Sequence, residues 1–505
     1  MLDYYLEPDI IEQKILLAIL LAEKDLSMET ICQKTSLTLP KVKQYIRQFN
    51  TLFKGRLYVK IDKSYIICQI KSNRKESFFH EVYHLSDTLK MLKFLLAESR
   101  YPKSIGSFSR RYFISKGKAY RLINKLKSYL KTVGLTIIDN TVRGEEFRIR
   151  YLIAMLHKEY GIILYKIESE DLKVIHAFIF SAQFNLKPSY FLNQKFLFFD
   201  VLLTLAWKRQ KYMTPLPAVD LFTRFKELSI FKHLTDHVKS QIEARINIKF
   251  STDDLDYLYL IYLTVDNSFY SNYWQNDNLK LVSHILITDP QYKKLVHRLE
   301  ALFKHQIDLR NQLYCLIPFF RRALFNLNGL ISFHDYYSKK YQGNQLLLRN
   351  VDEQIKQWLL DTSQLTNVCT GHLHFLCLHL EHIIETSLKP ITITIVENKR
   401  MLGDVLSYFI TASIPSYKVC ITRFNMMLES LENCDKDVDF VITSENILPI
   451  LEEQKIFSTK TTLFGLSMDC IQEQGQEVVN SIYKAYWQHY QNYIRELLTK
   501  EKEEP

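Results

Sequence analysis

Glycine is scarce in this chain, with only 12 among its 505 residues, where a soluble domain usually has about 7%. The sequence contains neither G-x-x-x-x-G-K-[ST] nor G-x-G-x-x-G. Those loops hold the phosphates of nucleotides, so their absence argues against the common nucleotide-binding enzymes. The low glycine content also favours a largely helical protein.

Closely spaced cysteines and long hydrophobic runs are missing as well. The eight cysteines are scattered without a CxxC pair, and no Cys and His residues have the spacing of a zinc site. The N-terminus is acidic and has no apolar signal core. Charged residues interrupt the apolar runs within about ten residues, too soon for a membrane span. We therefore expect a cytoplasmic protein with no membrane partner, catalytic residue, cofactor or metal ion.

Acidic residues are absent from Ser99 to Ile138, a window that holds ten Lys and Arg. The chain has a net charge of +11, and all of the excess lies near its start. Residues 1–160 contain 29 Lys and Arg against 16 Asp and Glu, whereas the remainder contains 37 against 39. This asymmetry predicts a polyanion-binding N-terminal part joined to a neutral body. A basic face that merely keeps the protein solvated is the alternative.

Residues 1–72 have the pattern of a winged helix-turn-helix. Apolar residues recur at helical spacing over 10–23, and Ser27 is a suitable N-cap for a helix over about 27–34. Thr38 caps a third helix, whose buried side is predicted to contain Val42, Ile46 and Phe49. The alternating segment 56–70 then predicts a β-hairpin that turns around 62–64.

Residues 73–165 repeat this pattern. We expect a helix over about 84–98, a short helix over 104–112, and a long helix from the Ser115 cap to about Val133. Leucines 122, 126 and 130 line the inner face of the long helix. A second wing is predicted around Asp139-Asn140, a turn-prone dipeptide.

A DNA recognition helix needs an apolar face to dock on its own domain and an outer face free of carboxylates near phosphates. The long basic helix meets both requirements, and the third helix of the first repeat is similar. The residues that we expect to contact DNA are Lys116, Lys118, Tyr120, Arg121, Lys125, Asn140 and Arg143 from the second repeat, and Lys41, Lys43, Gln44 and Arg47 from the first.

The remaining sequence predicts three further domains. Aromatic-rich helical sequence runs from about 166 to 389, and its two halves, 166–281 and 282–389, are similar in length and texture. After Pro390, strands alternate with helices, which predicts a small α/β domain over 390–505 with a mostly parallel sheet. The chain is thus expected to be mainly α and multidomain, with tandem winged helix-turn-helix domains. His233 and His237 stand four residues apart, but no carboxylate or third His completes a metal site beside them.

Taken together, these features resemble the Mga/AtxA family of global transcription regulators of Gram-positive bacteria. The most specific stretch is 114–156, where Ser115, Arg121, Leu126, Gly144, Glu146, Ile149 and Arg150 correspond to the family pattern. The resemblance implies a DNA-binding regulator, often an activator of virulence or carbohydrate-linked genes. It implies that 166–281 and 282–389 are similar to phosphotransferase-system (PTS) regulation domains (PRDs), and that 390–505 is similar to the EIIB component of sugar permeases.

The same resemblance implies three kinds of partner. Double-stranded DNA is the first, and a second copy of the chain is the second, as a homodimer or higher oligomer formed through the C-terminal domain. The third is a PTS phosphocarrier protein that phosphorylates histidines of the helical domains, for which His233, His237 and His284 are the candidates.

Two other functions stay open at this stage. An RNA-binding antiterminator with the same regulatory domains is one, although antiterminators usually begin with a small β domain. A phosphotransfer protein is the other. Its acceptor Cys would follow the first strand of the C-terminal domain, where this chain has Glu397 and no Cys.

Overall fold

The computed structural model describes residues 2–23, 25–62, 65–71, 75–98, 103–180, 197–265, 277–307, 309, 316, 324–331, 341–363, 370–430 and 434–498. The chain divides into two compact units. The first contains Met1–Tyr292, Leu316–Tyr336 and Leu359–Cys369, and the second contains Lys293–Cys315, Tyr337–Trp358 and Thr370–Pro505. Within the described ranges, none of the helices combines enough length and apolarity to cross a lipid bilayer.

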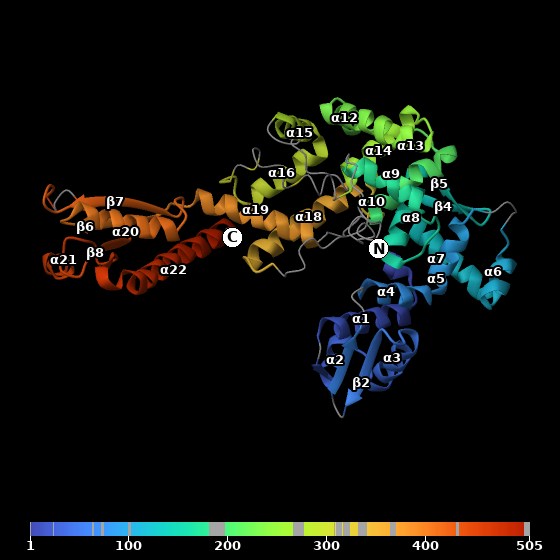
Figure 1. Cartoon of the computed structure of the whole chain (residues 1–505), viewed down its shortest axis with the longest axis horizontal. Coiled ribbons are helices and arrows are strands. Elements are labelled where there is room, and N and C mark those ends of the chain that lie inside the picture. The colour runs from blue at the N-terminus through green and yellow to red at the C-terminus, as the bar shows by residue number, and fades with distance from the viewer. Residues whose placement is uncertain are drawn as a thin grey trace, which may run out of the picture. The chain divides into compact units, whose positions relative to one another are not determined.

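The first unit begins with a winged helix-turn-helix domain, coloured blue in Figure 1. Its elements, after a short turn η1 (Leu2–Tyr5), are α1 (Pro8–Ala22), β1 (Asp25–Ser27), α2 (Met28–Thr35), α3 (Leu39–Leu52), β2 (Leu57–Asp62) and β3 (Tyr65–Ile70). As predicted, the Ser27 hydroxyl caps α2 by accepting a hydrogen bond from the Thr30 amide at 3.1 Å. The predicted hairpin is also present, because β2 pairs antiparallel with β3. The additional strand β1, which joins the free edge of β3, was not predicted.

A second winged helix-turn-helix domain follows. It contains α4 (Lys75–His84), α5 (Asp87–Leu96), α6 (Ile105–Tyr112), α7 (Lys116–Thr132), β4 (Leu135–Ile138) and β5 (Thr141–Gly144). The helix expected over about 84–98 is present as α5, but it is shorter than predicted, because the unpredicted helix α4 ends at His84 and α5 starts after Ser86. The Ser86 hydroxyl accepts a hydrogen bond from the Leu89 amide at 3.2 Å, which favours a helix start at this point over continuation.

Helix α7 and the second wing match the sequence-based prediction closely. Ser115 caps the helix through the Lys118 amide at 3.2 Å, and the three inner leucines are buried. The wing strands are joined by Asp139 and Asn140, both with positive φ (50° and 53°). Two residues of this kind form the tight turn that matches the twist of a hairpin. At the end of the wing, Gly144 has a φ of 145°, and an added Cβ would lie 2.6 Å from the Leu135 side chain.

Hydrogen bonds between the two helix-turn-helix domains centre on the residues that precede α1. The Glu7 carboxylate accepts hydrogen bonds from the Ser86 hydroxyl at 2.6 Å and from the Thr88 amide at 2.8 Å. The Tyr160 hydroxyl donates to the Asp3 carboxylate at 2.8 Å. The start of the chain thus joins the first domain to the second.

The middle of the chain is helical, as its aromatic-rich sequence predicted. Its elements are α8 (Glu146–Tyr160), α9 (Ser169–Phe180), α10 (Leu197–Lys208), η3 (Gln210–Tyr212), α11 (Asp220–Lys226), α12 (Ser229–Val238), the π-helical turn η4 (Lys239–Glu243), α13 (Ala244–Ile246), α14 (Thr252–Thr264), α15 (Asp277–Thr288), α16 (Pro290–Leu302), η7 (Leu324–Asn326), α18 (Gln345–Ser363) and α19 (Thr370–Ser387). The division into bundles over 166–281 and 282–389 stays a prediction. Parts of both ranges lie outside the described residues.

The C-terminal part is an α/β domain with an all-parallel sheet in the order β7-β6-β8-β9. Its elements are β6 (Ile391–Glu397), α20 (Arg400–Ser413), β7 (Val419–Asn425), β8 (Phe440–Ser444), α21 (Leu448–Gln454), β9 (Thr462–Leu466), η9 (Met468–Cys470) and α22 (Ile471–Leu498). Alternate residues of β6 face opposite sides: Ile393 and Ile395 pack with α20 and α22, whereas Val396 joins a cluster with Leu451 of α21. The predicted α/β fold with a mostly parallel sheet is confirmed, although α21 and β9 were not predicted. The likeness to an EIIB component stays a prediction.

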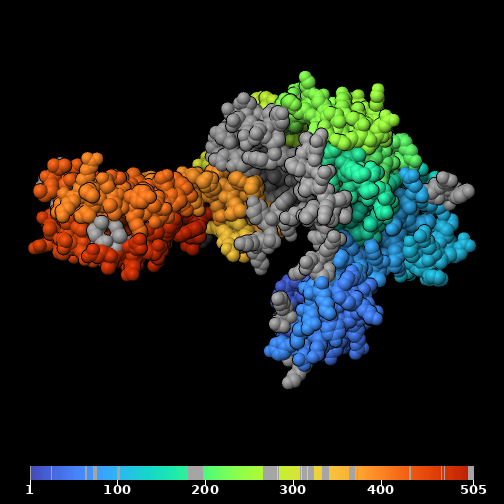
Figure 2. Space-filling model, viewed as in Figure 1, coloured from blue at the N-terminus to red at the C-terminus, as the bar shows by residue number. Residues whose placement is uncertain are grey.

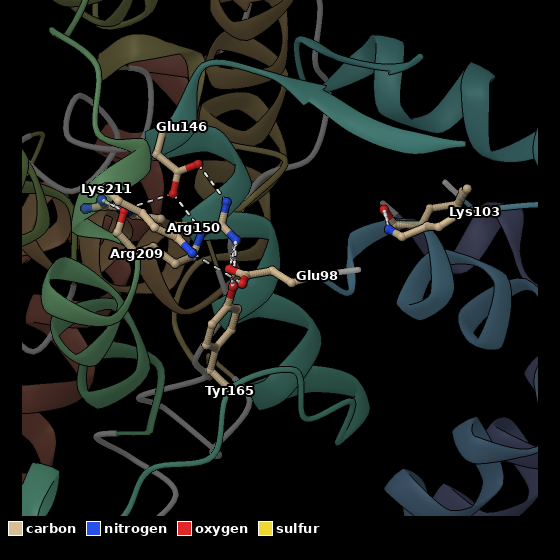
Figure 3. Close-up of polar contacts among 8 residues, drawn as sticks. Glu98, Lys103, Glu146, Arg150, Tyr165, Arg209 and Lys211 are labelled. Atoms are coloured by element: carbon tan, nitrogen blue, oxygen red, sulfur yellow. Dashed lines mark hydrogen bonds and ion pairs between the residues drawn. The ribbon is translucent and has the colours of Figure 1, made fainter. Parts of the chain in front are cut away.

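A buried ionic cluster connects the second wing to the helices that follow it (Figure 3). Glu146, the first residue of α8, accepts hydrogen bonds from the guanidinium groups of Arg150 at 3.0 Å and of Arg209 at 2.7 and 2.8 Å. Arg209 also donates to the Tyr165 hydroxyl, which donates to Glu98 at 2.5 Å. Arg150 is fully buried and stacks on the ring of Tyr257 at 4.4 Å.

We expect Glu146→Gln to destabilise this region by about 3 kcal/mol, because the substitution leaves the buried Arg150 guanidinium without its counter-charge and leaves Arg209 with only the longer 3.7 Å pair to Glu98. Hydrogen exchange of the α8 amides and urea denaturation measure the loss. The matched control is Glu145→Gln, since Glu145 forms a more exposed pair with Arg148 and its loss should cost less than about 1 kcal/mol. Equal effects of the two substitutions would contradict the assigned role of the cluster.

Candidate nucleic-acid interface

Helix α7 presents a strongly basic face at its N-terminal end. Lys116, Lys118, Tyr120 and Arg121 are exposed there, while the opposite face of the helix is buried in the second domain. No acidic residue lies on the helix itself. The first turn of an exposed helix offers amide donors and a positive dipole end, so this end suits a negatively charged ligand.

The turn between α6 and α7 adds exposed residues that were not among the predicted contacts. Arg110 and Arg111 are exposed at the end of α6. Arg110 lines an open hollow of about 470 Å³ together with Lys116. Phe113, which has a φ of 55°, is 96% exposed. The two arginines could have been predicted from the sequence, because both lie in the acid-free window from Ser99 to Ile138. The exposure of Phe113 could not, because it depends on the conformation of the turn.

Lys118 has a carboxylate partner that the local sequence does not reveal. Its ammonium group lies 2.6 Å from Asp87 of α5, and Asp87 also pairs with Lys90 at 3.1 Å. Burial by itself would raise the pKa of Asp87, but the hydrogen bonds from Lys118 and Lys90 outweigh it and hold the pKa below its ordinary value. Asp87 therefore remains charged and partly neutralises this end of α7.

Two other predicted contacts are engaged within the chain. The Lys125 ammonium donates to the backbone oxygen of Leu6 at 3.0 Å, and the Asn140 amide donates to the backbone oxygen of Lys103 at 2.8 Å. These polar groups therefore hold the N-terminal segment and the wing turn in place. Arg143 of the wing is exposed.

Lys103 lies beside this wing, apart from the buried cluster in Figure 3. Burial, and secondarily the charge of Arg143, lower the pKa of Lys103 to about 8. Its ammonium group donates to the backbone oxygen of Leu95 at 2.8 Å.

Helix α3 presents a smaller basic face in the first domain. Lys43, Gln44 and Arg47 are exposed on it. Lys41 instead pairs with Glu12 of α1 at 2.5 Å, and Glu12 also accepts a hydrogen bond from the Tyr45 hydroxyl at 2.6 Å. Figure 2 shows the surface of this domain in blue.

An open hollow of about 590 Å³ brings residues of both domains together. Arg47 of α3 and Lys118 of α7 both line it, as do the carboxylates of Glu7, Asp9 and Asp87. The two recognition-type helices thus contribute to one depression of mixed charge. A polyanion that reached Lys118 would compete with Asp87 for its ammonium group.

The three candidate histidines differ in their surroundings. The Nε2 atom of His237 lies 2.6 Å from the backbone oxygen of Phe178, and the two rings are 5.0 Å apart between centroids. His233 on the same helix is exposed, and so is His284 on α15. The structure does not bring the three histidines together with the basic helices.

Comparison with known proteins identifies both N-terminal domains. Residues 7–65 match the model described as the M protein trans-acting positive regulator (MGA) HTH domain, and residues 72–157 match the Mga helix-turn-helix domain. A search of curated proteins found no matching relative. The first matched segment runs from just before α1 to the start of β3, and the second runs from just before α4 into α8, so together they contain the helices of the two winged helix-turn-helix domains.

We expect Asp87→Asn to strengthen DNA binding by roughly two- to tenfold at low salt, because the substitution frees Lys118 and removes a negative charge near the phosphates. Fluorescence anisotropy with labelled duplex DNA measures the affinity. Glu170→Gln is the matched control, since it removes the same charge from an exposed pair on α9. An Asp87→Asn protein that is folded and binds no more tightly than the control would contradict this role of Asp87.

Proposed function

We propose that this chain is a transcription regulator of the Mga family and that it binds double-stranded DNA mainly through α7, because two Mga-family helix-turn-helix domains match its N-terminal part. Helix α3 makes the second contact with the DNA, and Arg143 holds the second wing against the sugar-phosphate backbone of the DNA. The observation that carries this proposal is the face of α7, where four exposed residues (Lys116, Lys118, Tyr120 and Arg121) stand opposite a buried apolar face.

The residues divide into three roles in this proposal. Tyr120 and Arg121 lie in the first two turns of α7, where a recognition helix reaches base edges. Arg110, Arg111 and Lys116 surround the preceding turn and contact phosphates. On α3, the side chains that contact phosphates are Arg47 and Lys43. Lys41, Lys125 and Asn140 support the domains and contribute less to affinity, because their polar groups already have partners within the chain.

Regulation by the phosphotransferase system is the second element of the proposal. The helical segments 166–281 and 282–389 act as the regulatory domains, and a phosphocarrier protein modifies exposed histidines in them. A phosphoryl acceptor must be reachable by its donor, a condition that favours His233 and His284 over the half-buried His237.

Assembly through the C-terminal α/β domain is the third element. Helix α20 exposes Met401, Val405 and Tyr408 at helical spacing, and the loop after β7 exposes Met427 and Leu428. Met401 is 80% exposed and Tyr408 75%. Apolar side chains gathered in this way on a surface favour contact with another protein. A second copy of the chain is the proposed partner, so that two sets of helix-turn-helix domains act on one site.

The DNA-binding proposal predicts that Lys118→Ala combined with Arg121→Ala abolishes most of the affinity for duplex DNA. Neither side chain is part of the core, so the fold should persist. Anisotropy at fixed salt should show a loss of at least about tenfold, since the variant loses one positive charge near the phosphates at Lys118 and one base contact at Arg121. The control is Lys166→Ala with Lys173→Ala, which removes two exposed lysines elsewhere. Unchanged affinity in the first double variant would refute α7 as the recognition helix.

The assembly proposal predicts that Met401→Glu combined with Tyr408→Glu weakens self-association at least tenfold, because charge would be introduced into an apolar contact. Sedimentation over a range of protein concentrations measures the effect. Leu346→Glu on α18, where an exposed apolar side chain is also replaced, should leave association unchanged. A double variant that associates like the wild type would place the interface elsewhere.

A further inference from the structure

A tight turn at the C-terminal end of α16 reverses the direction of the chain. One face of the helix is buried and contains Leu295 and Leu299. Beyond the helix end at Leu302, Lys304 and His305 have positive φ values of 50° and 57°. The His305 amide donates to the backbone oxygen of Glu300 at 2.8 Å. This six-to-one hydrogen bond is typical of a helix that ends in a left-handed turn, and it returns His305 to the last turn of the helix.

The reversal brings three metal-ligating side chains together. His297 and Glu300 are three residues apart on α16 and therefore lie on one face. One nitrogen of His297, one of His305 and one carboxylate oxygen of Glu300 all lie within 4.8 Å of one another. The two imidazole rings are 5.5 Å apart between centroids, with an interplanar angle of 39°.

We propose that His297, Glu300 and His305 bind a divalent transition-metal ion, with Zn²⁺ as the representative case. Two imidazoles and one carboxylate form a common ligand set for zinc and leave a fourth position for water or another ligand. Mg²⁺ and Ca²⁺ prefer oxygen ligands throughout, so the two histidines disfavour them. Because zinc–nitrogen bonds measure about 2.0–2.1 Å, the three donor atoms must move slightly closer together around the ion.

The burial of the three residues fits this role. His297 and His305 are exposed, so an ion can reach them from solvent. Glu300 is only 8% exposed, so its carboxylate would bind the ion from the protein side while the two imidazoles face solvent. Spacing alone did not suggest the site, because the third ligand reaches the other two only through the left-handed turn. The proposal does not rest on DNA binding or on the proposed regulation.

The consequence of binding would be a stabilised end of α16. An ion that bridges Glu300 and His297 on the helix to His305 after it holds the turn closed, and the binding free energy then adds to the stability of this segment. The segment lies in the second compact unit, so the effect is separable from the folding of the helix-turn-helix domains.

Calorimetric titration of the chelator-treated full chain with ZnCl₂ tests the site. We expect the wild type to bind one equivalent more than the His297→Asn/His305→Asn double variant, or to bind that equivalent at least tenfold more tightly. The matched control is His489→Asn, which removes an exposed histidine of α22 and should behave like the wild type. Identical isotherms for the wild type and the double variant, or no binding to the wild type, would overturn the proposal.

A Co²⁺ titration provides a second measurement that does not depend on the double variant. Cobalt bound by nitrogen and oxygen gives weak visible bands without thiolate charge transfer, whereas a site built from cysteines gives a strong thiolate band. Cys32, Cys68, Cys377, Cys420, Cys434 and Cys470 are free thiols, so a strong thiolate band would assign the bound metal to cysteine and overturn the proposal. Bands without thiolate character that disappear in either single variant, His297→Asn or His305→Asn, would support it.

Discussion

The buried ion cluster around Glu146 is the interaction on which the first unit depends. Glu146 follows the second wing directly, and its carboxylate lies between the guanidinium groups of Arg150 and Arg209. A buried charge is costly unless it is paired and hydrogen-bonded, so these three residues hold one another in place. The segment 324–331 adds to the same region, where Arg148 donates to the Phe325 backbone oxygen at 2.9 Å. Any movement of the following helices would therefore reach the wing through α8.

The basic faces of the two helix-turn-helix domains are less simple than the charge counts indicate. The fold brings Asp87 to Lys118 and Glu12 to Lys41, so carboxylates from other helices neutralise part of each face. Arg121, Arg110, Arg111 and Lys116 are not in any of these pairs among the described residues. In the proposed complex, DNA phosphates therefore compete with these internal carboxylates for Lys118 and Lys41.

Local signals made much of the fold predictable. The Ser115 cap, the inner leucines of α7, the Asp139-Asn140 turn and the parallel C-terminal sheet follow from spacing, capping and turn chemistry that operate over a few residues. The start of α5 after Ser86 was missed although its cap is local. The strand β1 and the pairing of Asp87 with Lys118 were missed because tertiary contacts decide them. Glu146 and Arg150 matched the family pattern, but their pairing with Arg209 required the structure. Sequence spacing did not indicate the grouping of His305 with His297 and Glu300, because the left-handed turn after α16 brings His305 back to the helix.

The central claim is that the basic face of α7 binds DNA by neutralising phosphates. The most direct test is the dependence of duplex DNA affinity on salt concentration, measured by anisotropy with the full wild-type chain. We expect a linear fall of log K with log salt, with a slope of about −3.6 or steeper if four or more phosphates are contacted, since each contributes about −0.9. Binding that is independent of salt, or an RNA affinity that exceeds the DNA affinity under the same conditions, would contradict it.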